Sequence, residues 1–87
     1  MYRVKSVTAY PAYKLDVEFE DGLKGTVSLR DRLFGPMFDR LRDEEFFAQV
    51  SVDEYGAICW PNGADLAPDA LYQTLKAASD QPNLVTA

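Results

Sequence analysis

Hydrophobic and polar residues alternate along two neighbouring stretches near the start of the chain, residues 13–20 and 23–29. A period of two places every second side chain on the same face of a β-strand, so the pattern predicts two half-buried strands. A three-residue loop between them pairs Leu15 with Val27 and keeps apolar side chains on one face, whereas a two-residue loop mixes polar and apolar positions. We therefore predict a hairpin whose three-residue turn ends at Gly22 with a left-handed backbone.

A second hairpin follows from the same reasoning further along the chain. Residues 50–53 and 57–60 flank a three-residue segment that ends at Gly56. A three-residue loop there pairs Val52 with Ile58, two apolar residues that then share one face. Two hairpins with the same kind of loop predict an antiparallel sheet as the scaffold of the protein.

Between the hairpins the hydrophobic period changes to that of a helix. Ser28 and Asp31 have the spacing of an N-terminal capping box, which predicts one or two helical turns before the Gly-Pro pair that ends at Pro36. Pro36 suits the first position of another turn, and Asp43 can cap a helix over residues 44–50. We expect all of these helices to be short.

The most regular helical pattern covers residues 68–78. This segment begins with proline, which suits the first position of a helix. An acidic residue follows it and a lysine lies near the end, as expected from the direction of the helix dipole. Leu71 and Leu75 lie four positions apart, and we expect them to pack onto the sheet together with Tyr72.

A chain of 87 residues has room for one hydrophobic core. We expect a single α+β domain over residues 1–78 and a C-terminal tail over residues 79–87. The domain should contain a small antiparallel sheet of about five strands, made of an N-terminal meander and the second hairpin. The meander should begin with a strand over residues 3–9. Short helices should lie between the hairpins, and the C-terminal helix should pack on the sheet.

The charge and composition limit which functions are plausible. The net charge of −5 disfavours direct binding to nucleic acid or anionic lipid. Histidine is absent, which removes the most common general base and metal ligand, and the single cysteine, Cys59, is interpreted as a core residue. The sequence contains no signal-peptide pattern and no membrane-spanning stretch, so we expect a cytoplasmic protein.

Three acidic residues offer the best candidate for ligand chemistry. Asp53, Asp65 and Asp69 could meet near the second hairpin and bind a hard metal ion or, with Tyr72, a small ligand. The alternative interpretation gives each acid a local role, in a turn, at backbone amides or at the start of a helix. No serine has a histidine to activate it and no phosphate-binding loop is present, so we expect no enzyme activity, no cofactor and no bound metal.

Two other groups of residues are candidates for a binding surface. The segment that starts at Trp60 combines a tryptophan with an Asn-Gly turn, and it fits either a structural corner between a strand and a helix or a protein-binding spot. Four arginines within thirteen residues fit either one basic patch or a solvated face of mixed charge. The candidate interaction surface consists of Trp60, Asn62, Gly63, Asp65, Tyr72, Arg30, Arg32, Arg40 and Arg42.

The order of these motifs resembles a bacterial family known as domain of unknown function 2442. The resemblance covers residues 2–78 and depends on a strand ending in Phe-Glu-Asp-Gly at residues 19–22 and on Trp-Pro-Asn-Gly-Ala-Asp-Leu-Ala-Pro at residues 60–68. It implies a small α+β domain without established catalytic residues. Some members of that family carry a helix-turn-helix domain, an extension for which this chain has no room. Others are encoded beside a small partner in arrangements that resemble toxin and antitoxin pairs.

These observations favour a non-catalytic protein-interaction module, the antitoxin-like partner of a small neighbouring protein. Its acidic surface and exposed aromatic residues suggest a partner of basic or mixed charge. Two alternatives stay open: a ligand- or metal-binding domain around Asp65, and a nucleic-acid accessory domain that uses the arginines between Arg30 and Arg42. Free strand edges would also allow a homodimer.

Overall fold

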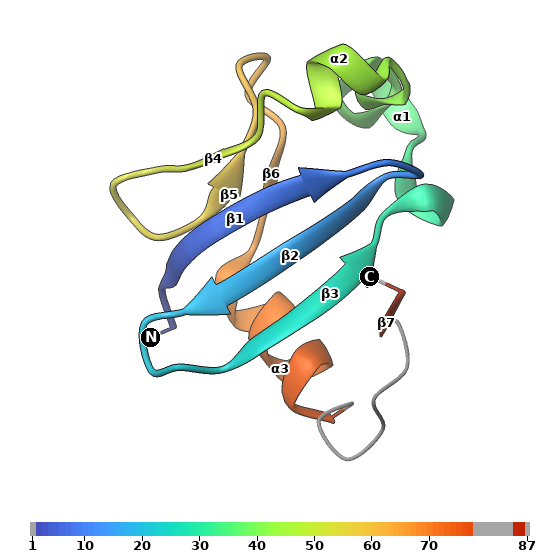
Figure 1. The fold of residues 1–87 in the computed structure, drawn as a ribbon. Helices are drawn as coiled ribbons and strands as arrows, with labels where there is room; N and C mark the ends of the chain where they lie inside the picture. The colour runs from blue at the N-terminus through green and yellow to red at the C-terminus, as the bar shows by residue number, and fades with distance from the viewer. Residues whose placement is uncertain (1, 78–84, 87) are drawn as a thin grey trace.

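The computed structural model describes residues 2–77 and 85–86 (Figure 1). The α+β class is confirmed, and the N-terminal half forms the predicted meander of three antiparallel strands. Its strands are β1 (Val4–Tyr10), β2 (Lys14–Phe19) and β3 (Lys24–Ser28).

The register of the first hairpin is as predicted. Leu15 lies opposite Val27, and both side chains are buried. The turn ends at Gly22, whose φ of 96° lies in the left-handed region, and Gly22 N–H donates to the carbonyl of Phe19. The three-residue loop is therefore confirmed, because it alone keeps the apolar positions of both strands on one face.

The second hairpin belongs to a separate sheet, made of β4 (Ser51–Val52), β5 (Ile58–Cys59) and β6 (Asp65–Leu66). The predicted pairing of Val52 with Ile58 is confirmed. The strand β6 was missed, because Asp65 and Leu66 were interpreted as part of a corner. Cys59, expected in the core, is only half-buried, and its Sγ lies 3.6 Å from Ser51 Oγ.

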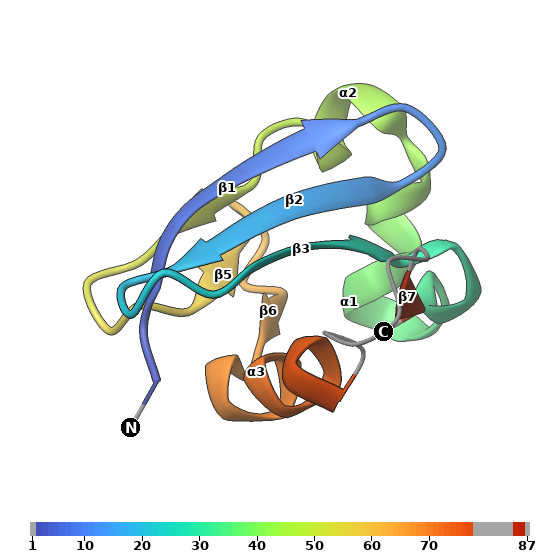
Figure 2. The same cartoon turned by 60° about the horizontal axis from the view of Figure 1, so that its bottom comes forward.

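The single sheet of about five strands is therefore not confirmed, and the described strands form two sheets. In both views β4 lies beside β1 (Figures 1 and 2), yet β1 pairs only with β2 in its sheet. One backbone hydrogen bond, from Val4 N–H to Gly56 O at 2.9 Å, joins β1 to the turn of the second hairpin. The register of β1 against β2 shifts between Val4 and Ser6, directly after the residue that bonds to Gly56.

Four short helical segments connect the two sheets and gather at one end of the molecule (Figure 1). Asp43 caps the last of them as predicted, since its Oδ1 accepts a hydrogen bond from Glu45 N–H at 3.0 Å. That helix ends at Phe47, however, and the expected extension to Val50 is wrong because the chain turns there into β4. The segments are η1 (Arg30–Arg32), α1 (Gly35–Phe38), η2 (Asp39–Arg42) and α2 (Glu44–Phe47).

The capping box predicted for the first of these segments is not formed. Leu29 occupies the N-cap position of η1, and no side chain caps this segment. Ser28 Oγ accepts a hydrogen bond from Arg30 N–H at 3.4 Å, two residues on rather than three. The segment is a single 3₁₀ turn and is too short for the reciprocal contact from Asp31.

The core lies between the meander, the second sheet and the C-terminal helix α3 (Pro68–Ala77), which all face one another in Figure 2. Leu71, Tyr72 and Leu75 are buried, as predicted. The contact between α3 and β3 is close: a Cβ at Gly25 would lie 2.5 Å from Leu75 Cδ2. Glycine at this position allows the helix to approach the sheet.

Beyond α3, Val85 and Thr86 form β7, which runs parallel to β3 and pairs with Val27 and Ser28. Residues 78–84 and 87, which include most of the predicted tail, lie outside the described residues. Among the helices of the described residues, none has the length and apolar character needed to cross a membrane.

Candidate protein-interaction surface

Trp60 is a core residue and is only 3% exposed. Its indole Nε1 donates a hydrogen bond of 2.9 Å to the carbonyl oxygen of Phe47, and its ring packs against Phe47 and Phe38. The buried indole therefore fills the space between α2 and the second sheet and satisfies its one donor there. Of the two interpretations left open by the sequence, the contacts of Trp60 match the structural corner.

The turn after Trp60 holds a neighbouring helix in place. Asn62 Oδ1 accepts a hydrogen bond from Ala64 N–H at 3.1 Å, while its Nδ2 donates to the carbonyl oxygen of Met37 at 2.8 Å. Gly63 has a φ of 93°, and a Cβ there would lie 3.1 Å from Met37 Cε. The side chain of Asn62 thus links the turn to α1, although the two segments are far apart in the sequence.

An exposed apolar surface lies where this turn meets α1. Phe34 is 67% exposed and Met37 is 42% exposed, and they lie within one turn of each other around the start of the helix. We call the surface formed by Phe34, Met37, Asn62 and Gly63 the α1 corner. The two apolar residues were not predicted as part of a binding surface, although a Phe-Gly-Pro-Met segment between helical turns is an unusual place for them.

Two of the four arginines lie next to the α1 corner. Arg42 Nε donates a hydrogen bond of 2.6 Å to the carbonyl oxygen of Leu33, the residue before Phe34, and lies 3.4 Å from Asp39 Oδ1. The guanidinium carbon of Arg32 lies 5.9 Å from the centre of the Phe38 ring, within the range of a cation–π contact. Two arginine side chains are therefore held by residues that neighbour Phe34 and Met37 in the sequence.

The other two arginines lie further along the same segment. Arg40 contacts the ring of Phe46, with its guanidinium carbon 4.6 Å from the ring centre. Arg30 is exposed in η1. The segment from Arg30 to Arg42 contains four arginines and two aspartates, so it carries a net charge of +2 within a chain of net charge −5.

The three acidic residues considered for a metal or ligand site have separate local roles. Asp53 Oδ1 accepts hydrogen bonds from two backbone amides of its own turn, at 2.8 and 3.0 Å, and Asp69 Oδ1 accepts from Tyr2 N–H at 3.1 Å. Asp65 is exposed in β6, where it lines a shallow pocket of about 120 Å³ together with Arg32. Residues 2–77 and 85–86 contain no group of three metal-ligating side chains. The structure therefore does not bring these aspartates together.

Tyr72, the last candidate residue, is part of an aromatic cluster at the far end of the sheet. Its ring stacks on Tyr2 with centroids 3.7 Å apart, and its hydroxyl donates a hydrogen bond of 2.5 Å to Asp21 Oδ2. This hydrogen bond raises the pKa of Tyr72 to about 12 and lowers the pKa of Asp21 below its ordinary value of 3.8. The contact links α3 to the first hairpin and explains Tyr72 as a structural residue.

These two shifts predict how the contact responds to pH. Because folding raises the pKa of Tyr72, its contribution to stability is complete below pH 10 and is lost as the pH rises toward about 12. Because folding lowers the pKa of Asp21, its contribution is present above about pH 4 and is lost as the pH falls through the lowered value. Absorbance at 295 nm should show one tyrosine that titrates near pH 12 in the wild type and is missing in Tyr72→Phe. If the tyrosine signal that is lost in Tyr72→Phe titrates near pH 10 in the wild type, the hydrogen bond between Tyr72 and Asp21 is contradicted.

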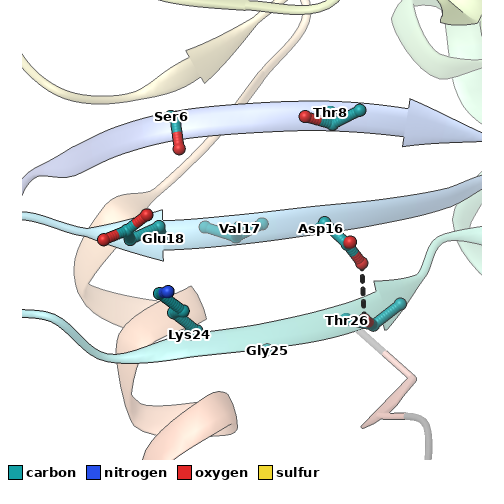
Figure 3. A pocket seen from close by; sticks show the side chains of 8 residues that line it. All are labelled: Ser6, Thr8, Asp16, Val17, Glu18, Lys24, Gly25 and Thr26. Carbon is teal, nitrogen blue, oxygen red and sulfur yellow. Dashed lines mark hydrogen bonds between the residues drawn. The ribbon is translucent and has the colours of Figure 1, made fainter.

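The outer face of the meander carries a shallow hollow of about 320 Å³ (Figure 3). Two of its acidic side chains have partners on the neighbouring strands: Thr26 Oγ1 donates to Asp16 Oδ1 at 2.5 Å, and Glu18 Oε2 lies 3.9 Å from Nζ of Lys5, which is not part of the lining. Along β2, the polar residues of this face alternate with buried residues, as the strand pattern predicts. The hollow is lined by Ser6, Thr8, Asp16, Val17, Glu18, Lys24, Gly25 and Thr26.

A family described as "Protein of unknown function (DUF2442)" matches residues 4–77. The match includes both segments on which the resemblance was based, residues 19–22 and 60–68, and confirms it. No curated protein and no solved structure matches the chain significantly.

Proposed function

The chain belongs to the DUF2442 family, and we propose that it is a non-catalytic protein-interaction module that binds its partner at the α1 corner. One observation carries the proposal: Phe34 and Met37 are large apolar side chains that stay 67% and 42% exposed beside arginines. Neighbouring exposed apolar residues with polar surroundings are typical of interaction sites, and aromatic, methionine and arginine side chains are enriched in interfaces.

The rigidity of the α1 corner supports the same proposal. The carbonyl of Met37 is held by Asn62, and the backbone N–H of Phe34 donates to the carbonyl oxygen of Arg32 at 2.9 Å. A surface that is ordered before binding loses less conformational entropy when the partner arrives. Asn62 therefore acts in binding by positioning α1, while Trp60 holds the corner from the core.

The partner in this proposal is a small protein, as expected for the antitoxin-like member of a pair in the cytoplasm. The resemblance to family members encoded beside small partners supports this choice. The absence of histidine from the sequence supports a function without acid–base catalysis. Self-association through strand edges is a separate prediction.

Affinity purification of the tagged chain from its source organism tests the proposal. We expect a small partner in stoichiometric amount, and its recovery should fall at least tenfold with Phe34→Ser or Met37→Ser, since hot-spot residues dominate interface energy. Tyr55→Ser is the matched control, because Tyr55 is 69% exposed in the turn of the second hairpin. Recovery that depends equally on Tyr55 and Phe34, or on neither, would place the interface elsewhere.

A further inference from the structure

We infer that the partner presents an acidic segment with a large apolar side chain to the α1 corner. This inference rests on the proposed function and adds the chemistry of the partner. It also reverses the partner charge suggested by the overall charge of the chain.

The segment that contains Phe34 and Met37 has a charge opposite to that of the chain as a whole. The segment from Arg30 to Arg42 carries +2, so the remaining residues carry −7. Charges further apart than about 10 Å are largely screened at physiological salt, so a bound segment senses mainly the charges beside it. An acidic segment is attracted at this surface, and the negative remainder of the protein orients it toward the arginines.

The contacts of Arg42 and Arg32 leave their charges well placed for carboxylates. Both contacts of Arg42, to Leu33 and to Asp39, are made through Nε, and the guanidinium carries two further NH₂ groups that can bind a carboxylate in a bidentate way. Arg32 packs against the ring of Phe38, which keeps the charged group ordered without neutralising it. Both arginines are therefore anchored to residues of the same segment as Phe34 and Met37.

The apolar part of the surface distinguishes a peptide from other acidic ligands. Phe34 and Met37 gain from contact with an apolar side chain, which removes their exposed surface from water. A nucleic acid would supply phosphates for the arginines, but its row of phosphates would extend beyond them onto the acidic remainder of the protein, which a short peptide segment does not reach. An acidic peptide with an apolar anchor is complementary to both parts of the α1 corner.

Selection of random twelve-residue peptides displayed on phage against the full chain tests this inference. We expect enriched peptides to combine aspartate or glutamate with a leucine, phenylalanine or tryptophan. An enriched peptide, made synthetically with a fluorophore, is then titrated with the chain at several salt concentrations. Its affinity should fall as salt rises, because charge pairs at the rim of the interface are screened.

Matched variants locate the binding site. Phe34→Ser should weaken binding about 30-fold and Tyr55→Ser should leave it unchanged. Arg32→Gln should weaken binding about threefold to tenfold and reduce its salt dependence. Lys24→Gln makes the same change of charge on the outer face of the meander and should have little effect. Circular dichroism checks that each variant is folded.

Several results would overturn the inference: no enrichment, enrichment of basic or uncharged peptides, or tighter binding of a single-stranded oligonucleotide through the same arginines. A dimer that Phe34→Ser dissociates would make a second copy of the chain the occupant instead. If the natural partner still depends on Phe34 while selected peptides are not acidic, only the partner chemistry is wrong. If the natural partner does not depend on Phe34, the proposed function itself fails.

Discussion

Replacing Trp60 by alanine is expected to remove a large part of the free energy of unfolding of the protein. Truncation of a buried tryptophan costs about 3 to 5 kcal/mol, whereas small domains have a total stability of about 5 to 15 kcal/mol. Trp60 is 3% exposed and contacts the rings of Phe47 and Phe38, so the cavity would open between α2 and the second sheet. The loss would also leave the carbonyl of Phe47 without the indole donor.

Urea unfolding followed by circular dichroism measures this effect. Trp60→Phe is the graded control, because it keeps an aromatic ring and removes the hydrogen bond to Phe47 O, which should cost about 1 to 3 kcal/mol. A stability of Trp60→Ala within about 1 kcal/mol of the wild type would contradict the core role of Trp60. That result would favour the interpretation of Trp60 as an exposed binding residue.

Replacing Gly56 by alanine is expected to have the second largest effect. Its φ is 78°, and a Cβ would lie 2.7 Å from Arg3 Cβ and 2.9 Å from Arg3 Cα, which is part of the backbone. The left-handed conformation costs about 1 to 2 kcal/mol for alanine, and the steric overlap adds about 1 to 3 kcal/mol. The same contact carries the hydrogen bond from Val4 to Gly56, so the two sheets should separate at this point.

Gly22→Ala is the matched control for this prediction. Gly22 also has a positive φ, 96°, in a three-residue turn, but no atom lies within 4 Å of the position of its Cβ. It should therefore lose only the conformational part, about 1 to 2 kcal/mol. Equal losses of unfolding free energy in the two variants would show that Arg3 moves aside and that the contact between the sheets is unimportant for stability.

The hairpins could be predicted because two local rules agree there. Alternation fixes which face of each strand is buried, and the glycines at positions 22 and 56 fix the length of each turn. The pairings of Leu15 with Val27 and of Val52 with Ile58 follow from these rules alone. Local pattern was also sufficient for α3, whose buried residues repeat at helical spacing.

The division into two sheets could not be predicted in this way. The second sheet includes the pairing of β6 with β5, and a strand of two residues leaves no periodic signal in the sequence. Periodicity also does not show that α2 stops at Phe47, because the chain continues with apolar residues into β4. These features are set by tertiary contacts.

The proposed α1 corner includes some of the residues that were singled out from the sequence. Asn62, Gly63 and the arginines were identified, but Trp60 and Tyr72 are buried. Aromatic residues suit an interface or a core equally well, and only the three-dimensional contacts separate the two. Phe34 was missed because a single apolar residue in a loop carries no period, and its exposure follows only from the three-dimensional structure.

Chemical-shift mapping tests the central claim most directly, by recording amide spectra of the ¹⁵N-labelled chain with and without its co-purified partner. The α1 corner as the binding site predicts that the largest changes fall on residues 32–38 and on Asn62 and Gly63. Changes concentrated on the outer face of the meander, around Asp16 and Thr26 (Figure 3), would contradict it and identify the sheet as the interface.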